Sequence, residues 1–285
     1  MKVLITGANG YVGARLMEDL SNYYETYGTY HTKNLDKLLR LDVANKEEVI
    51  SIVNRIRPEM IVHASAIPNQ NKADQDVELA KRVNVVGTTN VAEAANGVGA
   101  SVVFISSNVA LAPERYGTYG ITKFEAEKVI EKMCKDYLIL RPGLIIGQSP
   151  NTENDRFQNR LLNNIVKKTP AIYDNVEKYE VTWAGQLCEV IVEAKKRNIT
   201  SETIPIVVDE YKTRFEIARD ILQNFNVDVT QKEEQKPVES GWATTRTLKE
   251  LNLKVYGYTE VIEKTVEEIK DYLKNKFQDR SLTRY

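Results

Sequence analysis

Short apolar runs alternate along the first half of the chain with longer stretches in which apolar residues recur at helical spacing. The apolar runs cover residues 2–5, 25–30, 39–43, 60–63, 101–106 and 137–140. The helical patterns cover residues 11–20, 46–56, 76–95 and 119–135. Repeated strand–helix units predict parallel strands joined by helices, and the run 102–105 lacks the polar alternation of a strand that faces water. We therefore predict an α/β fold with a doubly wound parallel sheet.

The second half of the chain is less regular. After a polar loop at 148–155, the pattern predicts helices over 155–168, 183–196, 213–224 and 258–276, and a strand over 204–208. Thr259 is the expected N-cap of the last helix, and 278–285 has the composition of a loose tail. We expect one domain over 1–148 and a smaller mixed α/β lobe over 149–285, with residues 174–198 returning to the first domain's sheet.

A glycine turn directly follows the first apolar run. Gly7, Gly10 and Gly13 separate that run from the first helix, which begins near Tyr11 and Val12. In this setting the first glycine permits a tight turn, the second lets the backbone approach a phosphate, and the third lets the helix pack closely on the strand. An ordinary strand-to-helix turn is the alternative. The pattern favours a dinucleotide-binding domain over 1–148, with these five residues at the cofactor.

Composition excludes several classes of protein. The 39 Lys and Arg residues nearly balance the 40 Asp and Glu residues, so net charge indicates neither a nucleic-acid nor a membrane partner. Two cysteines do not make a disulfide framework, and two histidines without cysteine neighbours indicate no metal site. No apolar run approaches the ~20 residues that span a bilayer, and we see no signal peptide. We expect a cytoplasmic protein that holds no metal ion.

Tyr119 and Lys123 lie one helical turn apart on one face of a predicted helix. A neighbouring cation lowers the pKa of a phenol, which suits a general acid or base that acts on a carbonyl or alcohol oxygen. Tyr272 and Lys276 have the same spacing, but we interpret them as part of a charged amphipathic helix. Ser107 follows a strand, where ligands of parallel sheets bind, and could donate to an oxyanion; turn formation is its alternative role.

Seven short motifs occur along the first half in one order: T-G-A-N-G-Y-V-G, L-D-V, H-A-S-A, V-N-V-V-G-T, I-S-S-N, Y-G-I-T-K and L-R-P-G. In this set and order, the chain resembles the extended branch of the short-chain dehydrogenase/reductase superfamily. Within that branch it is most similar to the dTDP-4-dehydrorhamnose reductases and their relatives. The resemblance implies a Rossmann sheet, a nicotinamide cofactor and a smaller substrate lobe.

The resemblance also implies roles for four catalytic residues. Tyr119 would donate a proton to the substrate carbonyl oxygen while a hydride arrives from the nicotinamide. Ser107 would hydrogen-bond the same oxygen, and Lys123 would lower the pKa of Tyr119 and hold the nicotinamide ribose. Asn84 would support a water molecule that connects to the lysine, or would serve only in packing.

Further cofactor contacts follow from the same resemblance. Asp42 and Val43 would contact the adenine. Ala64, Ser65 and Ala66, which follow the fourth strand, would line the cofactor, and Pro142 would lie near the carboxamide.

The choice of cofactor depends on the end of the second strand. NAD enzymes of this fold place a carboxylate about 20 residues after the glycine turn, and the segment 29–33 contains none. His31 and Lys33 could meet a 2′-phosphate there, as could Arg15; as the alternative, His31 and Lys33 are solvated loop residues. The segment therefore favours NADP(H) over NAD(H).

The chain departs from the family pattern in the region that shapes the substrate pocket. Only residues 108–118 separate Ser107 from Tyr119, and Asn108 stands where the relatives often carry aspartate. We expect Ser107 and Asn108 to contact the substrate. Arg156 and Arg160, one turn apart on a predicted helix, could hold a diphosphate or form a solvated basic face.

These observations lead to an NADP(H)-dependent reductase of a keto group on a nucleotide-linked sugar as the leading hypothesis. One alternative keeps the fold but makes the chain a nucleotide-sugar epimerase or dehydratase with recycled cofactor. The other is a non-catalytic NADP-binding regulatory subunit, similar to the methionine adenosyltransferase beta subunit. A nucleotide sugar is the expected partner, and a homodimer is the oligomeric state that we consider.

Overall fold

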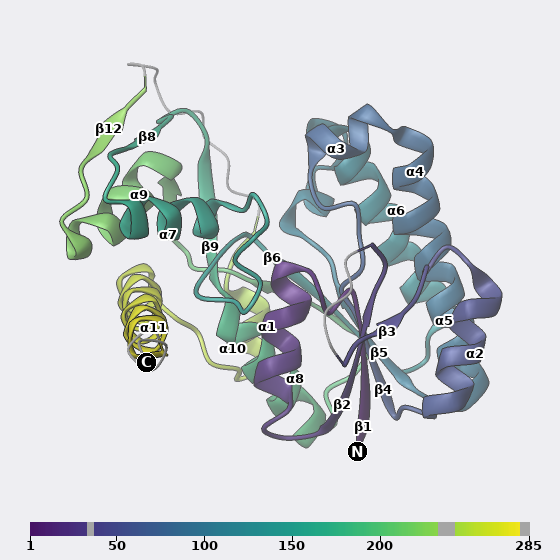
Figure 1. Ribbon diagram of the computed structural model, residues 1–285. Helices are drawn as coiled ribbons and strands as arrows, with labels where there is room; N and C mark the ends of the chain where they lie inside the picture. Colours follow the sequence, from purple (N-terminus) through teal and green to yellow (C-terminus); the bar gives the residue numbers. More distant parts are fainter. Residues whose placement is uncertain (33–36, 233–242, 280–285) are drawn as a thin grey trace.

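A computed structural model describes residues 1–32, 37–232 and 243–279. Its larger lobe contains a seven-stranded, all-parallel sheet in the order β10-β6-β5-β4-β1-β2-β3 (Figure 1). The strands are β1 (Lys2–Thr6), β2 (Glu25–Tyr30), β3 (Leu39–Arg40), β4 (Met60–His63), β5 (Ser101–Ile105), β6 (Tyr137–Pro142) and β10 (Glu202–Ile206). The predicted doubly wound parallel sheet is confirmed.

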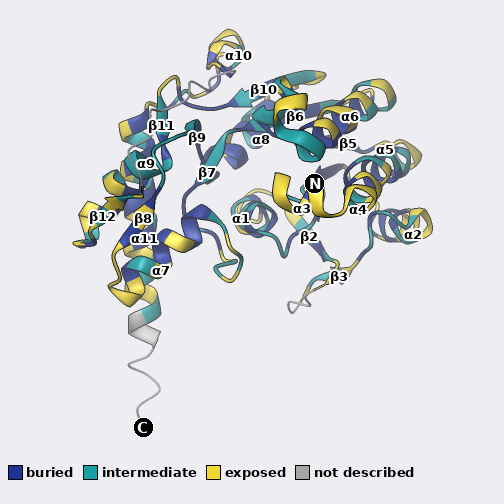
Figure 2. Cartoon of the chain, turned by 90° about the horizontal axis from the view of Figure 1, so that it is seen from above, coloured by how far each residue is buried: buried dark blue, intermediate teal, exposed yellow. Residues whose placement is uncertain are grey.

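Helices cover both faces of this sheet. On one face, α1 (Tyr11–Leu20) and α8 (Ala184–Lys196) pack on apolar residues of β1, β4 and β5, and on the other α2 (Lys46–Ile56), α5 (Gly87–Val98) and α6 (Gly117–Met133) do so (Figures 1 and 2). The strand residues alternate between the two cores: Val3 and Ile5 face α1, whereas Leu4 faces α2. A strand buried on both faces needs apolar residues at successive positions, which is the pattern seen in the sequence.

The carboxyl ends of the central strands lie side by side. Thr6 of β1 is in register with His63 of β4, and His63 is in register with Phe104 of β5. The buried imidazole of His63 joins Thr6 Oγ1, 2.7 Å from Nδ1, to Thr88 Oγ1, 3.1 Å from Nε2. The segments that follow these three strands therefore leave the sheet at the same edge.

Two predicted elements of the larger lobe were wrong in extent. The expected helix over 76–95 is divided into α4 (Val77–Lys81), a π-helical turn (Arg82–Val86) and α5, and is preceded by α3 (Gln70–Gln75). The expected strand over 39–43 ends at Arg40, because the Asp42 carboxylate accepts the amide of Ala44 at 2.9 Å and turns the chain toward α2. Local side-chain bonds of this kind compete with a strand ladder.

The smaller lobe has two short sheets around its own core. One contains β7 (Leu144–Ile146), β9 (Lys178–Trp183) and β11 (Tyr211–Thr213), and the other contains β8 (Ala171–Tyr173) and β12 (Val229–Gln231). Helices α7 (Phe157–Lys167), α9 (Arg214–Leu222) and α11 (Tyr258–Asp279) complete the lobe, whereas α10 (Arg246–Glu250) packs against β10 of the large sheet. The strands of the smaller lobe were not predicted from the sequence. β7, β8, β11 and β12 have three residues each, too few to establish a period, whereas the six residues of β9 alternate between polar and apolar side chains and could have indicated a strand.

The chain returns from the smaller lobe to the larger one through α8. Within 174–198, β9 belongs to the small sheet, whereas Leu187 and Ile191 of α8 lie in the core of the large one. The strand that joins the large sheet is β10, which pairs with β6 and begins two residues before the predicted 204–208. In the part of the chain that the structure describes, no helix is long and apolar enough to cross a membrane. The predicted tail at 278–285 lies mostly outside the described residues.

The close packing of α1 on β1 generates a stability prediction. A Cβ on Gly13 would lie 2.2 Å from the carbonyl oxygen of Gly7, whereas a Cβ on Gly97, an exposed position of α5, would meet nothing within 4 Å. We expect Gly13→Ala to lower the free energy of unfolding by about 2 kcal/mol or more, because the helix must move off the strand. Gly97→Ala should instead stabilise by about 0.5–1 kcal/mol. Urea unfolding measures both; equal effects would contradict the packing described.

Candidate active site

The glycine turn has the geometry of a backbone cradle. Gly7 has a left-handed φ of +68°, and a Cβ there would lie 3.0 Å from the backbone of Ser65. Gly10 is the N-cap of α1 and provides no side chain to cap it, and the first turn of α1 contains no acidic residue. The backbone amides of Tyr11 and Val12 therefore form the uncapped, partly positive end of this helix, which suits a phosphate.

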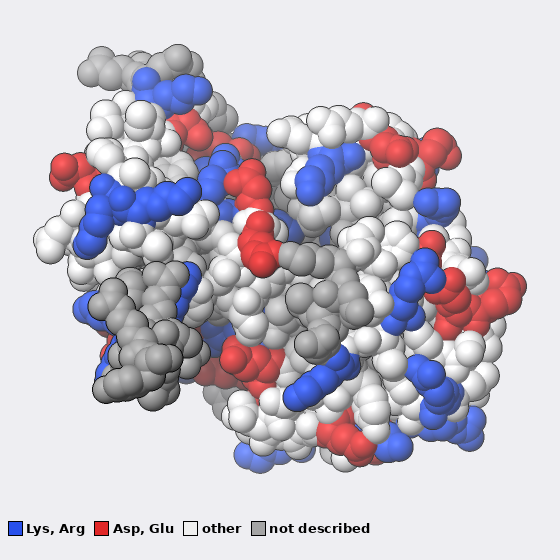
Figure 3. Space-filling view, in the orientation of Figure 1, with Lys and Arg blue, Asp and Glu red and all other residues white. Residues whose placement is uncertain are grey.

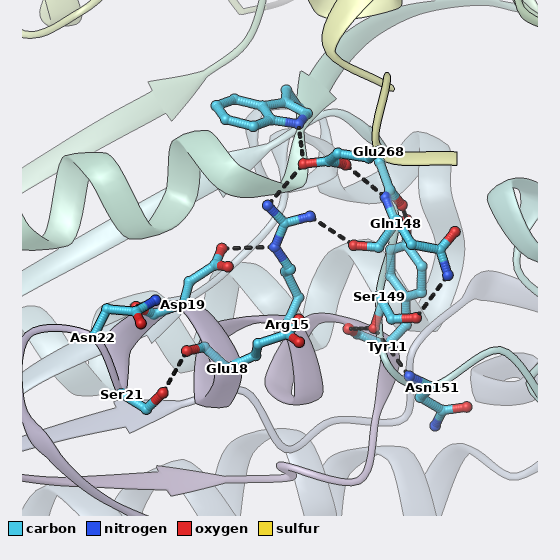
Figure 4. A network of polar contacts seen from close by, with 12 residues as sticks. Tyr11, Arg15, Glu18, Asp19, Ser21, Asn22, Gln148, Ser149, Asn151 and Glu268 are labelled. Carbon is cyan, nitrogen blue, oxygen red and sulfur yellow. Dashed lines mark hydrogen bonds and ion pairs between the residues drawn. The ribbon is translucent and has the colours of Figure 1, made fainter. Parts of the chain in front are cut away.

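The loop that leads into the smaller lobe is fastened to this turn (Figure 4). The Tyr11 hydroxyl donates to the carbonyl of Gly147, Ser149 Oγ donates to the carbonyl of Tyr11 at 2.7 Å, and the Asn151 amide donates to the carbonyl of Asn9. The side chain of Tyr11 is thus used to join the two lobes. Only its backbone remains for the predicted cofactor contact.

Arg15 has a different role from the one expected. Its guanidinium donates to Asp19 Oδ2 at 2.7 Å, to the carbonyl of Gln148 at 2.6 Å and to Glu268 Oε1 of α11 at 2.8 Å (Figure 4). Trp183 Nε1 donates to the same Glu268 oxygen at 3.0 Å. The expectation that Arg15 is available for a 2′-phosphate is therefore wrong, since Asp19, Gln148 and Glu268 occupy its donors.

The ends of β2 and β3 bring His31 and Asp42 together. His31 Nε2 lies 3.9 Å from Asp42 Oδ2, and the imidazole is 56% exposed. Val43, the next residue, is buried and packs near α5. Lys33, the other expected contact of a 2′-phosphate, lies outside the described residues. Sequence reasoning found no carboxylate near His31, because Asp42 comes from another strand's end.

The segment after β4 passes beside the glycine turn. Ala64 donates its amide to the carbonyl of Thr6 at 3.3 Å, and Ser65 donates its amide to Thr6 Oγ1 at 3.3 Å. Ala64, Ser65 and Ala66 are all partly exposed at this edge. Ser65 thus lies next to Gly7, and the cofactor-lining role of these three residues stays a prediction.

Asn84 is held entirely by protein groups. Its Oδ1 accepts the amide of Ile67 at 2.7 Å, and its Nδ2 donates to Thr122 Oγ1 at 3.0 Å. The side chain thus links the segment after β4 to α6, next to Lys123. It sits in the π-helical turn Arg82–Val86, and such turns often occur at functional sites. These contacts support a packing role, which was the alternative for this residue.

Two adjacent serines at the end of β5 point to different partners. Ser106 Oγ donates to the buried Glu127 carboxylate at 2.5 Å, so it faces the core. Ser107 accepts the amide of Val109 at 3.4 Å, and its hydroxyl shares a hydrogen bond with Tyr119. Ser107 is therefore the serine that shares a site with the phenol.

The electrostatic environment of Tyr119 differs from the expectation. Burial raises the pKa of Tyr119 above its ordinary value, while the charge of Arg156 and the hydrogen bond with Ser107 act in the lowering direction. The predicted net lowering by Lys123 is wrong for this geometry. A phenol with a raised pKa stays protonated at neutral pH and can donate its proton.

Lys123 is buried, with its ammonium group directed at the sheet. Its Nζ donates to the carbonyl of Ile105 at 2.8 Å and lies 4.7 Å from the centre of the Phe104 ring. Burial lowers the pKa of Lys123 to about 8, and the carboxylate of Glu127 opposes that shift. The amine is therefore mostly charged at neutral pH and loses its charge in mildly alkaline solution.

Asn108 contacts a residue of the smaller lobe that sequence reasoning missed. Its Nδ2 donates to Glu180 Oε2 of β9 at 2.6 Å, and Glu180 Oε1 accepts the amide of Ala243 at 3.1 Å. Glu180 is buried beside Gly143, where a Cβ would collide with the Glu180 carbonyl oxygen. No spacing in the sequence connects these residues, because they come from different lobes. Pro142, next to Gly143, is buried at the end of β6.

The structure separates the two arginines expected to act together. Arg156 precedes α7, and its charge influences the pKa values of Tyr11, Tyr119 and Lys123, so its guanidinium lies near the glycine turn and the phenol. Arg160 points elsewhere.

Arg160 is 51% exposed and pairs with Asp155 at 3.3 Å. It lines a cavity of about 470 Å³ with Lys167, Arg214 and Lys232, in the smaller lobe. Lys and Arg gather on the face of that lobe where Figure 1 places α7 (Figure 3). Of the two arginines, Arg156 is therefore the one that lies near Ser107 and Tyr119.

Glu127 is a second residue that sequence reasoning missed. It lies one helical turn after Lys123, is fully buried, and pairs with Arg141 of β6 at 2.5 Å. Its spacing from Lys123 on a predicted helix could have indicated it, but a Lys–Glu spacing of one turn is common on exposed helices.

Comparison with known proteins adds three findings. The RmlD substrate binding domain family model matches residues 1–252. The chain is 26% identical over 223 residues to a dTDP-4-dehydrorhamnose reductase of Aggregatibacter actinomycetemcomitans, covering 71% of this chain and 70% of that protein. It is 22% identical over 242 residues to the methionine adenosyltransferase 2 subunit beta of Xenopus laevis, covering 79% and 72%.

Solved structures show the same fold. A dTDP-4-dehydrorhamnose reductase of Bacillus anthracis in complex with NADP superimposes with a TM-score of 0.76 at 23% identity, covering 94% of this chain and 99% of the other. This likeness shows the fold, and the match of the family model over residues 1–252 establishes the family. The chain belongs to the RmlD substrate-binding domain family, within the extended short-chain dehydrogenase/reductases.

Proposed function

We propose that the chain is an NADP(H)-dependent reductase of a keto group on a nucleotide-linked sugar, similar to dTDP-4-dehydrorhamnose reductase. The observation that carries this proposal is the convergence of Ser107, Tyr119 and Lys123 at the carboxyl end of β5, the edge of the sheet from which the glycine turn also leaves β1. Family membership and the reductase relatives support the reaction type.

The residues present fit a dinucleotide. Gly7 and Gly10 leave room for its phosphates at the uncapped start of α1, and Ser65 forms the opposite wall. Val43, Ala64 and the segment to Ala66 would line its length, with Pro142 near its other end. When bound, NADPH supplies the hydride for reduction of a carbonyl carbon.

The protein's own groups would manage the carbonyl oxygen. The Tyr119 hydroxyl, kept protonated by its raised pKa, would donate a proton to that oxygen as negative charge develops. Ser107 would donate a hydrogen bond to the same atom, and the positive charge of Arg156, which acts to lower the pKa of Tyr119, would stabilise the phenolate left behind. Arg156 would attract an anionic substrate group toward Tyr119.

A regulatory, non-catalytic role is the second candidate. Similarity to a methionine adenosyltransferase 2 subunit beta supports it. A dehydratase would require a further acid–base group, and the Glu180 carboxylate accepts a hydrogen bond from Asn108, the residue next to Ser107. Both of its carboxylate oxygens accept hydrogen bonds, which supports a structural role for it instead.

Removal of the phenol tests the catalytic assignment. We expect Tyr119→Phe to reduce kcat for dTDP-4-dehydrorhamnose by about 10²–10⁴-fold, because the proton donor is lost, with the Kd for NADPH within about twofold. Tyr272→Phe is the matched control, since Tyr272 and Lys276 share the same spacing on α11. Wild-type protein that binds NADPH but reduces no nucleotide-linked keto sugar would favour the regulatory role.

The cofactor preference is tested at the end of β2. We expect the Kd for NADPH to be at least about tenfold lower than the Kd for NADH. His31→Ala should reduce this difference by raising the Kd for NADPH alone, because the exposed imidazole of His31 can meet a 2′-phosphate. Fluorescence titration measures both constants. NADH binding as tightly as NADPH would defeat the proposed preference.

The two arginines provide a test of the substrate subsite. We expect Arg156→Ala to raise KM for the nucleotide sugar by about tenfold or more, since a charged hydrogen bond to the substrate is lost. Arg160→Ala should leave KM within about twofold, because Arg160 faces Asp155 and a separate cavity. Steady-state kinetics at saturating NADPH decide this, and equal effects of the two substitutions would count against the assignment.

A further inference from the structure

Glu127 joins three elements at one buried point. Its Oε1 accepts Ser106 Oγ at 2.5 Å and Arg141 Nε at 2.9 Å, and its Oε2 accepts the second guanidinium nitrogen of Arg141 at 2.5 Å. The carboxylate is fully buried and Arg141 nearly so. Helix α6, which carries Tyr119, is thereby fastened to β6 and to the residue that immediately precedes Ser107.

The charge of the same carboxylate also acts on the ammonium group of Lys123, which is buried one helical turn earlier on α6. Glu127 acts in the direction that keeps Lys123 charged, whereas burial and the nearby charge of Arg156 act against it. From β4, His63 also faces this region, but its pKa is lowered to about 3 by burial and by Lys123, so it carries no charge near neutral pH. Glu127 is therefore the group that offsets the cost of burying the amine.

We propose that Glu127 is a positioning residue of the active site, which holds the end of β5 against α6 and provides the negative charge that accompanies the buried ammonium group of Lys123. This inference rests on the proposed reductase function for its effect on turnover. Its effect on Lys123 does not depend on turnover. Tyr119 and Ser107 remain the groups that would touch the substrate.

The substitution Glu127→Gln separates charge from shape. A glutamine keeps the size of the side chain and an oxygen that can accept from Ser106 or Arg141, but it removes the negative charge. Glu131→Gln is the matched control, because Glu131 is one turn further along α6, partly exposed, and pairs with Lys128 at 2.7 Å. The double variant Glu127→Gln with Arg141→Met removes both charges, so that no buried cation is left without its partner.

Two readouts measure the result. One is the pH dependence of kcat/KM between about pH 6 and 10, measured with NADPH and dTDP-4-dehydrorhamnose and fitted to the titration of one essential group. The other is the titration of the ¹³Cε resonance of Lys123 in lysine-labelled protein, assigned with a Lys123→Arg sample. The second readout needs neither substrate nor turnover.

We expect the wild-type amine to titrate near its pKa of about 8. In Glu127→Gln the titration should move down by about one pH unit or more, because an opposing charge is lost. The kcat/KM of Glu127→Gln should then be about tenfold below that of the wild type at pH 9. At pH 6 the two should differ little, because Lys123 is charged in both proteins. Glu131→Gln should follow the wild type, and the double variant should follow Glu127→Gln.

Other outcomes distinguish the claims. A uniform loss of kcat/KM with an unchanged Lys123 titration would overturn the inference and leave Glu127 a purely structural residue. Failure of both Glu127 variants to fold, judged by circular dichroism, would do the same. Absence of wild-type turnover together with a shifted Lys123 titration would instead contradict the proposed reductase function and retain the role of Glu127.

Discussion

The burial of the Lys123 ammonium group is the constraint on which the arrangement of the site depends. An ammonium group in a protein interior needs hydrogen-bond acceptors and a compensating charge. Here the carbonyl of Ile105 and the face of Phe104 receive it from β5, and Glu127 offsets it from α6. Meeting these needs fixes α6 against the end of β5, which is why Tyr119 comes within hydrogen-bonding reach of Ser107.

A second constraint joins the two lobes at the start of the chain (Figure 4). Arg15 of α1 is shared among Asp19, the carbonyl of Gln148 and Glu268 of α11, and the side chain of Tyr11 holds Gly147. The glycine turn is thus connected to the loop that leads to Arg156. A bound dinucleotide and an anionic substrate would therefore meet on parts of the chain that are fastened to each other.

Sequence reasoning could predict what depends on local spacing. The strand, glycine turn and helix at 2–20 follow from periodicity and steric needs, and the parallel order of the strands places Ser107 and Lys123 at one edge. It could not predict Asp42 beside His31, Glu180 beside Asn108 or Glu268 on Arg15, because each pair is brought together only by tertiary folding. Such contacts leave no period and no motif in a single sequence.

The direction of the Tyr119 pKa shift was wrong for a related reason. The spacing of Tyr119 and Lys123 on a helix identified a cation but not the burial of the phenol, and burial is the larger effect. The expectation that Arg156 and Arg160 act together was wrong, because α7 begins between them and their side chains point to different surfaces. Helical spacing describes neighbours on one element and does not tell where that element faces.

The most direct measurement of the central claim is the transfer of label from NADPH deuterated at the nicotinamide C4. We expect wild-type protein, given this cofactor and dTDP-4-dehydrorhamnose, to form a reduced sugar that carries one deuterium by mass spectrometry, with one NADP⁺ produced for each sugar reduced. Sugar recovered without deuterium, with the labelled NADPH intact, would contradict the assignment of Ser107, Tyr119 and Lys123 to carbonyl reduction.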